Sequence, residues 1–566
     1  LAAAVQAPAE VIGKAGSAAD SYLKNFGEES VRGHPMFVCS RLVQHLERAV
    51  RNCSGKGPWE AVSVGAYNGV AQGAPLVVEL STLQGASGAS AVAEAAGTAS
   101  GVVLLSESFD GLEDVPPGVT AVLSRSNVDL LSHLALRARQ SGALLACCSD
   151  TDVWKAVVDG ANAQADGNPL CVKLDNGTGS LQLDSASDDN APVASVTKNS
   201  PPVDGQEAPS RSMGVVGNSS SWAVAPPEYS AGVVGGKSIN LERLRSIAAE
   251  VGASTGVNVK VPSSVALPFG AFERVIEAEE NASAQKALQA ALVALESAGG
   301  DRTATRSALA NARAAVEQLS PPTGLIEEVR EASSAASAHA IVAACEVAPE
   351  PSWWPEVRRV WASKWNERAH ASRVAMGIRE VDLHMAVLIM ELVPSQYSFV
   401  LHSRNPLAPS SPKGEMLGEV VVGLGETLVG NHPGSPLRFT ATSSSGAPAA
   451  SGILFHALPS KLEAMCAVDC DKQPLICRSD SNGEDLEEFA GAGLYDSFTT
   501  SGGVASAAVD YSNEPLLWDD AFRTSMCDKL ARVAISLEEH MDGPQDIEGS
   551  VVGETVYLLQ ARRQQL

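Results

Sequence analysis

One histidine stands in a setting suited to carrying a phosphoryl group. His133 lies in the segment Asp129–Gly142, whose apolar residues recur at helical spacing and predict a helix. Ser132 is a suitable helix cap, so the histidine is expected in the first turn. Arg137 follows one turn later on the same side, and a helix N-terminus also favours an anionic group. A partly buried histidine near a helix start is the plainer interpretation, and the pattern alone leaves both open.

Two later segments carry residues that suit a nucleotide polyphosphate. Val233–Leu244 holds a Gly-Gly turn before a helix that opens at Lys237, so phosphate could approach the backbone beside a point charge. The spacing excludes a P-loop, and a plain strand–turn–helix junction is an equal alternative. Pro474–Phe498 delivers Arg478 from a buried strand into a loop of Ser, Asp, Asn and Gly, which suits a nucleotide. Its acidic residues imply an intervening Mg²⁺, although a surface ion pair fits the pattern about equally.

A third segment, Gln545–Arg563, is expected to form a hairpin. With a three-residue turn, period-2 alternation places Asp546 opposite Gln560. Glu548 and Arg562 fall on the same face of this hairpin. Glu548 and Gln560 would then offer a carboxylate and an amide to one divalent ion held between phosphates. Without the other two segments this pattern indicates only an edge hairpin.

The chain has 566 residues, too many for one hydrophobic core, and its composition predicts a multidomain α/β protein. Residues 1–58 are expected to be the helical end of a preceding region. Short apolar runs alternate with helical patterns over 59–175, which predicts a compact α/β domain. Residues 176–228 are rich in Ser, Asp, Asn, Gly and Pro and are expected to be a flexible linker, on which one domain swings. Residues 229–566 should form a larger α/β domain with an Ala-rich, exposed helical hairpin at about 278–319.

The composition also excludes several classes of partner. With 41 basic against 66 acidic residues the net charge is −25, which disfavours nucleic acid but not a neutral polymer such as a glucan. No apolar run approaches the roughly 18 residues needed to cross a membrane.

The cysteines contain no CxxC pair, so neither a zinc site nor a disulfide framework is expected. Trp353, Trp354, Trp361 and Trp365 are expected in the core rather than as platforms for sugar rings.

The last domain resembles the nucleotide-binding domain of the α-glucan water dikinases in the strings GGKSINL, VWASKWNERA, VVGLGETLVG, CRSDSNGEDLE and QDIEG–VYLLQAR. The first domain resembles the phosphohistidine domain of the same enzymes in VTAVLS and DLLSHLALRAR. The resemblance implies a swivelling phosphohistidine domain followed by an ATP-grasp nucleotide-binding domain. Pyruvate-type dikinases have the opposite order and then a (β/α)₈ barrel of about 250 residues, so the glucan branch of the family is expected.

The resemblance also implies roles for individual residues. His133 matches the histidine that accepts the β-phosphate of ATP and then donates it, with Arg137 beside it. Five further residues match positions that hold the nucleotide phosphates or lie near Mg²⁺: Lys237, Arg478, Glu548, Gln560 and Arg562. Glu548 and Gln560 are the expected metal ligands.

The activity implied is ATP + α-glucan + water → AMP + phosphoglucan + phosphate, with Mg²⁺, in a plastid. A homodimer is left open. The strings VALPFG and ASKWNERA are closer to the enzyme that favours the glucosyl C6 hydroxyl than to the phosphoglucan water dikinase, which favours C3. The alternatives are a phosphoenolpyruvate-synthase-like dikinase and a homologue that binds glucan or nucleotide without catalysis.

One departure from the plant members concerns redox control. Those members carry a CxxxC pair shortly after the histidine that can form a regulatory disulfide. This chain has Leu144 at the first of these positions and Cys148 at the second. A bridge between the neighbours Cys147 and Cys148 would be strained, so no regulatory disulfide is expected here.

Overall fold

The structure is a computed structural model, and most of the chain beyond residue 55 is described. The described residues are 53, 56–83, 86–97, 99, 101–108, 113, 115–163, 169–175, 177–185, 216–217, 219–299, 301–347, 350–375, 377–407, 415–443, 450–468, 474–483, 485–486, 489–490, 494–500, 502–541 and 543–564. The helix expected before residue 52 lies outside them. None of the described helices has both the length and the apolar character that a membrane span requires.

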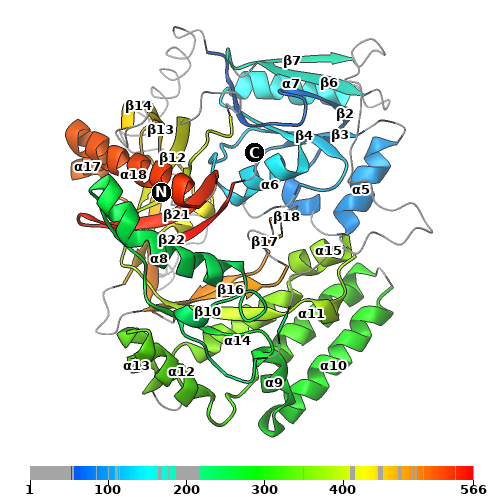
Figure 1. Ribbon diagram of the computed structural model, residues 1–566. Helices are drawn as coiled ribbons and strands as arrows, with labels where there is room; N and C mark the ends of the chain where they lie inside the picture. The colour runs from blue at the N-terminus through cyan, green and yellow to red at the C-terminus, as the bar shows by residue number, and fades with distance from the viewer. Residues whose placement is uncertain are drawn as a thin grey trace, which may run out of the picture.

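The first domain is built on a seven-stranded sheet with the order β1-β5-β4-β3-β2-β6-β7 (Figure 1). Its strands are β1 (Trp59–Val64), β2 (Val70–Val77), β3 (Val102–Ser106), β4 (Val119–Ser124), β5 (Leu144–Cys148), β6 (Leu170–Asp175) and β7 (Ser180–Ser185). The four central strands pair in parallel, and β1, β6 and β7 pair antiparallel at the edges. Central strands such as β3 are buried throughout, and β3 is apolar up to its last residue, Ser106, because both faces of the sheet are covered. β7 extends this sheet into the segment that the sequence predicts as linker.

Helices cover both faces of this first sheet. They are α5 (Ala86–Ala96), α6 (His133–Ser141) and α7 (Thr151–Ala163). Side chains of α5 and α6 pack in one cluster, and Trp154 of α7 packs in the cluster on the opposite face. The helix expected from about Ser132 to Gln140 is therefore α6, which lies on the side of the domain that faces the rest of the molecule (Figure 1).

The second domain contains two larger sheets, ordered β19-β16-β10-β9 and β14-β13-β12-β11-β21-β22-β8. The strands are β8 (Asn258–Lys260), β9 (Ser264–Leu267), β10 (Met385–Glu391), β11 (Tyr397–His402), β12 (Glu415–Val422), β13 (Leu437–Ser443), β14 (Ala450–Ala457), β16 (Leu475–Ser481), β19 (Ser497–Thr499), β21 (Gln545–Val552) and β22 (Thr555–Arg563). Two small ribbons pair β15 (Glu463–Ala467) with β20 (Val504–Ala508), and β17 (Asp485–Leu486) with β18 (Phe489–Ala490).

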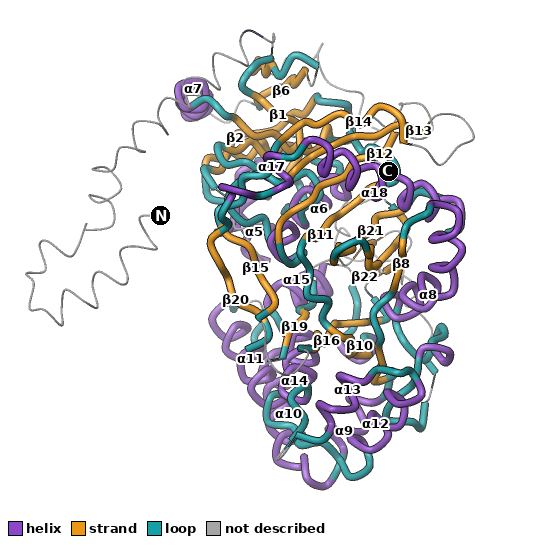
Figure 2. Tube along the Cα trace, turned by 90° about the vertical axis from the view of Figure 1, so that its left-hand side faces the viewer, coloured by secondary structure: helices purple, strands orange, loops and turns teal. Residues whose placement is uncertain are grey.

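The helices of the second domain are α8 (Gly236–Thr255), α9 (Ala271–Glu277), α10 (Ala282–Ser297), α11 (Arg302–Val316), α12 (Leu325–Ala335), α13 (His339–Cys345), α14 (Trp354–Ala362), α15 (Glu367–Ala375), α16 (Glu426–Val429), α17 (Pro515–Trp518) and α18 (Asp520–His540). Figure 2 shows α9 to α14 grouped around the four-stranded sheet, and α8 and α18 beside the larger sheet of the second domain. Short 3₁₀ turns lie at Leu80–Leu83, Pro226–Glu228, Glu279–Asn281, Ser363–Trp365, Glu380–Asp382 and Tyr511–Asn513.

The Ala-rich segment forms α10 and α11, and Leu288 of α10 is buried in the cluster that covers the four-stranded sheet. The same cluster holds the four tryptophans of the 353–365 region, each at most 1% exposed. The prediction that these tryptophans are core residues is confirmed. α8 and α18 pack together on one face of the seven-stranded sheet of the second domain, where their side chains form a second hydrophobic cluster.

The two domains also share one hydrophobic cluster. Val400, Leu417, Val421 and Leu428 of the second domain pack in the cluster that contains Leu134 of α6. Val400, Leu417 and Val421 lie on the face of the sheet opposite to the one covered by α18. The start of α6 is thereby packed directly against the second domain.

The adjacent cysteines of β5 test the redox expectation. Cys147 is 2% exposed and Cys148 is fully buried, and both are free thiols. Burial raises the pKa of Cys147 to about 12, and the Cys148 thiol donates to the Asp150 carbonyl at 3.3 Å. The thiolate is the reactive form, so neither group is poised for disulfide exchange.

We predict that Cys147 and Cys148 resist maleimide labelling in the native protein while the exposed Cys53 is labelled rapidly. Peptide mass spectrometry after a timed pulse measures both rates in one sample. Labelling of the β5 thiols at a rate within a few-fold of Cys53 would contradict the prediction. Denatured protein, in which all three positions react, is the control.

Candidate active site

The helix that carries the candidate histidine begins as its sequence predicts. His133 is the first residue of α6, and the Ser132 hydroxyl caps the helix by accepting from the Ala135 amide at 3.4 Å. Arg137 follows one turn later, is buried, and donates to the carbonyl of Glu113 at 2.8 Å. The helix start and its cap are thus confirmed, and the chemical roles of His133 and Arg137 stay predictions.

A row of paired residues crosses the seven-stranded sheet of the second domain, on the face that packs against α6 of the first domain. Arg438 of β13 pairs with Glu419 of β12, and Glu419 pairs with Val400 of β11. Val400 pairs with Glu548 of β21, which pairs with Gln560 of β22. Directly paired residues point to the same face of a sheet. One face therefore carries the predicted metal ligands at one end of the row and the contact with α6 at the other.

The register of the β21–β22 hairpin differs from the predicted one. The turn has two residues, Gly553 and Glu554, and an extra residue, Leu559, forms a bulge in β22. Asp546 therefore pairs with Arg562 instead of Gln560, and the prediction of that pair was wrong. Arg562 donates to Asp546 at 2.8 Å and 2.9 Å. Burial alone would raise the pKa of Asp546, but Arg562 and His402 outweigh this effect and lower the pKa. A bulge interrupts period-2 alternation, so the simple pattern cannot reveal it.

Arg478 connects the two sheets of the second domain at this point. Its guanidinium donates to the Gln560 side-chain oxygen at 2.7 Å and lies 3.6 Å from the Glu548 carboxylate. It also donates to the carbonyl of Leu559, the bulged residue, at 3.3 Å. The structure thus brings three of the predicted residues, Arg478, Glu548 and Gln560, into one cluster.

Lys237 reaches the end of the same strand that carries Arg478. Its ammonium donates to the carbonyl and the hydroxyl of Ser479, at 2.9 Å and 3.0 Å. The amides of Gly235 and Lys237 are not left open to phosphate, because the Asp480 carboxylate accepts from them at 3.0 Å and 2.9 Å. A side chain at Gly235 would collide with Asp480, which explains the glycine there. Phosphate contact is therefore expected from the Lys237 side chain rather than from these two amides.

Sequence reasoning missed Glu426, although it stands in the quoted string VVGLGETLVG. Glu426 begins α16 and keeps an exposed surface, yet burial among surrounding atoms and the charges of Glu548 and Asp496 raise its pKa. The signal was an acidic residue at the end of a strand, directly after a glycine turn. Three carboxylates close to one arginine form a site that a cation would stabilise.

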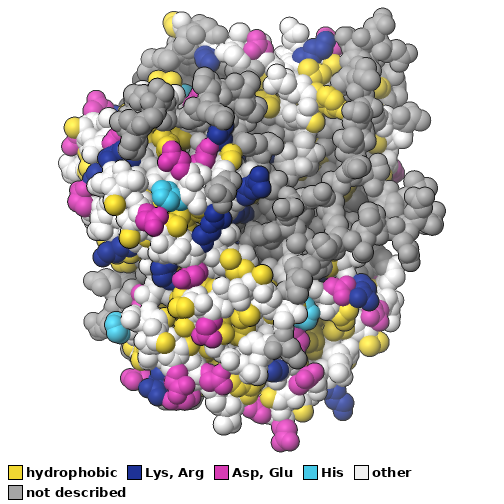
Figure 3. Space-filling view, in the orientation of Figure 1, with side chains coloured by type: hydrophobic (Ala, Val, Ile, Leu, Met, Phe, Trp, Pro, Cys, Tyr) yellow, Lys and Arg dark blue, Asp and Glu magenta, His cyan; other side chains and the backbone are white. Residues whose placement is uncertain are grey.

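The described residues of the cluster do not form an all-protein metal site. Among the described residues, no three His, Cys, Asp or Glu side chains converge closely enough to hold a metal ion alone. Mg²⁺ is commonly held by one or two carboxylates together with substrate phosphates. Lys and Arg side chains also gather in the middle of the face shown in Figure 3, where the hairpin ends in Figure 1. In a chain of net charge −25, these cationic side chains are groups that an anionic ligand can bind.

The loop before His133 is tied to the sheet by Glu419. This carboxylate is fully buried and accepts from the amides of Leu130 and Leu131, at 3.3 Å and 3.1 Å. Arg438 donates to Glu419 at 2.7 Å and to Glu60 of the first domain at 2.5 Å. Hydrogen bonds to a charged acceptor are among the stronger ones, and here they bind backbone two residues away from His133.

A second buried pair lies next to this one. The Lys461 ammonium donates to Asp129 at 2.5 Å, and the Asp129 amide donates to Asn431 at 3.0 Å. Burial, followed by the charge of Glu419, raises the pKa of Asp129 to about 7 despite the opposing effect of Lys461. The interface thus holds the carboxylates of Glu60, Asp129 and Glu419 against Arg438 and Lys461, and Arg139 of α6 also interacts with Glu419. We call these five residues, Glu60, Asp129, Glu419, Arg438 and Lys461, the interdomain charge network.

Two family models match the chain. The phosphohistidine-like domain of α-glucan water dikinase matches residues 89–188, and the AMP/ATP-binding domain of pyruvate phosphate dikinase matches residues 345–443. These matches confirm the predicted fold class, a phosphohistidine domain followed by an ATP-grasp-type domain.

The chain is also similar to curated proteins over nearly its whole length. It is 32% identical to the chloroplastic α-glucan water dikinase of Solanum tuberosum over 99% of this chain and 35% of that protein. It is 31% identical to α-glucan water dikinase 2 of Arabidopsis thaliana over 95% of this chain and 38% of that protein. A phosphoenolpyruvate synthase of Aeropyrum pernix is 28% identical over 42% of this chain and 27% of its own length. The chain thus spans little more than a third of the glucan dikinases that it matches.

We predict that contact between the domains weakens as pH rises toward 7. The pKa of Asp129 is about 7 in contact and returns toward its ordinary value near 4 once solvent reaches it. Formation of the contact between the domains therefore takes up a proton. The equilibrium constant for contact formation should fall up to about tenfold per pH unit between pH 5 and 7 and level off above 7.

Hydrogen–deuterium exchange at the Leu130 and Leu131 amides, corrected for intrinsic pH dependence, measures this equilibrium. Asp129→Asn should flatten the profile. Asp382→Asn, at an exposed ion pair, should keep it. An unchanged slope in Asp129→Asn would contradict the assignment to Asp129.

Proposed function

Because this chain is a homologue of the α-glucan water dikinases, within the wider pyruvate phosphate dikinase and phosphoenolpyruvate synthase family, we propose that it phosphorylates α-glucans through His133. The observation that carries the proposal is the row of paired residues that joins the Arg478–Glu548–Gln560 cluster to the loop before His133. This row puts the helix of the candidate histidine and the candidate nucleotide cluster on one face of one sheet.

The first half-reaction is ATP + His133 + water → AMP + phosphohistidine + phosphate. The Arg478 guanidinium and the Lys237 ammonium would neutralise the triphosphate and hold it in line with the acceptor. Neutral imidazole at His133 would attack, which divides one difficult transfer into two easier ones. The N-terminus of α6 would stabilise the phosphoryl group that His133 then carries.

Glu548 and Gln560 are the residues that would hold Mg²⁺. Carboxylate and amide oxygens suit this ion, and burial together with the charges of Glu548 and Asp496 raises the pKa of Glu426 beside them. Mg²⁺ would supply charge neutralisation on the phosphate oxygens. Arg478 lies within reach of both residues.

The second half-reaction is phosphohistidine + α-glucan → His133 + phosphoglucan. A glucan hydroxyl must reach His133 while water is kept away, which requires the first domain to separate from the second at the interdomain charge network. Transfer to the glucosyl C6 hydroxyl, rather than C3, follows from the strings VALPFG and ASKWNERA. A plastid is the proposed location, in line with the relatives named as chloroplastic.

A phosphoenolpyruvate-synthase-like activity is the second candidate, favoured by the similarity to the archaeal synthase. Measurement of ATP-dependent AMP formation with amylopectin and, separately, with pyruvate discriminates the two. AMP formation that responds to pyruvate and not to amylopectin would overturn the glucan proposal.

The intermediate can be tested with ATP labelled at the β-phosphate. We expect acid-labile, alkali-stable label on the protein, and His133→Ala should abolish both this label and its transfer to glucan while nucleotide binding is retained. His339→Ala, at an exposed position on α13, is the matched control and should behave as the wild type. Full glucan labelling by His133→Ala would rule out His133 as the carrier.

The nucleotide site can be tested by truncating its two cations. Arg478→Ala and Lys237→Ala should each weaken ATP binding by about ten- to hundredfold, since a hydrogen bond to a charged group contributes roughly 1.5–3 kcal/mol. The double variant should lose less than the sum of the two, because both act on one polyphosphate. Arg330→Ala removes an exposed ion pair on α12 and is the control for loss of an arginine. Strict additivity, measured by calorimetry, would argue against one shared ligand.

A further inference from the structure

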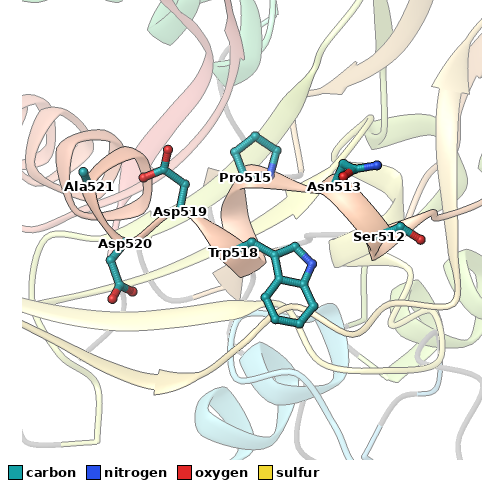
Figure 4. A pocket seen from close by; sticks show the side chains of 7 residues that line it. All are labelled: Ser512, Asn513, Pro515, Trp518, Asp519, Asp520 and Ala521. Carbon is teal, nitrogen blue, oxygen red and sulfur yellow. The ribbon is translucent and has the colours of Figure 1, made fainter.

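A second candidate site lies on the seven-stranded sheet of the second domain, on the side opposite to the one that contacts α6. The turn that joins α17 to α18 borders a shallow pocket of about 560 Å³ (Figure 4). α18 packs on the face of the sheet that carries Phe399 and Leu401, whereas α6 packs on the face of Val400. The pocket therefore plays no part in the phosphoryl-transfer cluster described above.

Trp518 forms the apolar surface of this pocket. Its side chain is 70% exposed, far more than the tryptophans of the core. The indole N–H donates to the carbonyl of Tyr511 at 2.5 Å, and the Trp518 amide donates to Glu514 at 3.1 Å. These bonds fix the ring on the turn before any ligand arrives. A rigid aromatic face offers contact area at little cost in side-chain entropy.

Polar side chains surround the indole on both sides. Figure 4 shows Asp520 on one side of Trp518, with Ser512 and Asn513 on the other. Ser512 and Asn513 are exposed, and the Asp520 side chain is 89% exposed. The Asp519 carboxylate caps α18 by accepting from the Phe522 amide at 2.9 Å. The pocket thus offers hydroxyl, amide and carboxylate groups around one flat apolar surface.

This combination selects the chemistry of the ligand. The carboxylates of Asp519 and Asp520 disfavour phosphates and other anions, although Arg523 pairs with Asp520 and offsets part of its charge. A pyranose ring is uncharged and has a flat C–H face with a rim of hydroxyls that both donate and accept. The indole matches that face, and the surrounding groups match the rim.

The surface also has room for more than one sugar residue. A second pocket of about 560 Å³ shares Pro515 with the first and extends toward Tyr397, Phe522 and Gly553. Its lining also combines aromatic and polar side chains, among them Gln396. A short stretch of a polymer could therefore lie across both pockets.

We propose that Trp518 is the stacking platform of a secondary binding site for α-glucan chains, which holds the polymer without taking part in phosphoryl transfer. This inference takes its ligand class from the proposed function. A polymer held at a second site raises the local concentration of its other segments near His133. The site thus increases apparent affinity for long chains and leaves the chemical step unchanged.

Isothermal titration of the full chain with maltoheptaose tests the site. Trp518→Ala should weaken binding at least about fivefold, the size expected for one aromatic stacking contact. Asn513→Ala should weaken it less. Val381→Ala, which truncates another side chain that is 70% exposed, is the matched control and should bind as the wild type. Absence of wild-type binding at millimolar maltoheptaose, or equal binding by Trp518→Ala, overturns the inference.

Label transfer from β-labelled ATP separates this inference from the proposed function. Trp518→Ala should keep the wild-type rate of protein labelling and the maximal rate of transfer, and should raise the amylopectin concentration needed for half-maximal transfer. If the wild type transfers label and Trp518→Ala needs the same amylopectin concentration for half-maximal transfer, the secondary site is refuted and the proposed function stands. If maltoheptaose binding depends on Trp518 but the wild type transfers no label, the proposed function is refuted and the binding site stands.

Discussion

The buried carboxylate of Glu419 is the contact on which the arrangement of the two domains depends. It has no exposure to solvent, and it satisfies two backbone amides of one domain and an arginine of the other. Removing one partner from such a group leaves a buried charge uncompensated, which typically costs about 3–5 kcal/mol. Because the amides belong to the loop that leads into α6, the position of His133 follows from this contact.

The same interaction sets a limit on how firmly the domains can hold together. A buried network gives a defined geometry, but the cost of removing its charged groups from water keeps the net stabilisation small. An interface with these properties suits a domain that must dock in one orientation and later leave. Apolar contacts of Val400 and Leu428 add affinity without direction, whereas the charged groups supply the orientation.

Local patterns in the sequence predicted the features that local physics determines. The cap at Ser132, the burial of the tryptophans and the α/β class follow from spacing over a few residues. The interdomain charge network could not be predicted in this way, since Asp129 and Lys461 are 332 residues apart. The role of Asp480 at the start of α8 was also missed, because the Gly-Gly turn is compatible with either a phosphate or a carboxylate. Long-range pairing had to be supplied by the fold.

The bulge at Leu559 affects how this protein responds to mutation. Arg478 donates to the backbone carbonyl of that residue, while its side chain packs in the cluster beside α8. Replacing the side chain leaves the carbonyl in place, so scanning by single substitutions would report the position as one of packing only. Removing the residue would take away the acceptor and leave the side chains of Arg478, Glu548 and Gln560 present. The contact with Arg478 therefore depends on the number of residues in β22 and not on the side chain at position 559. Variants of the hairpin are better compared by the number of residues between paired positions than by the residue types.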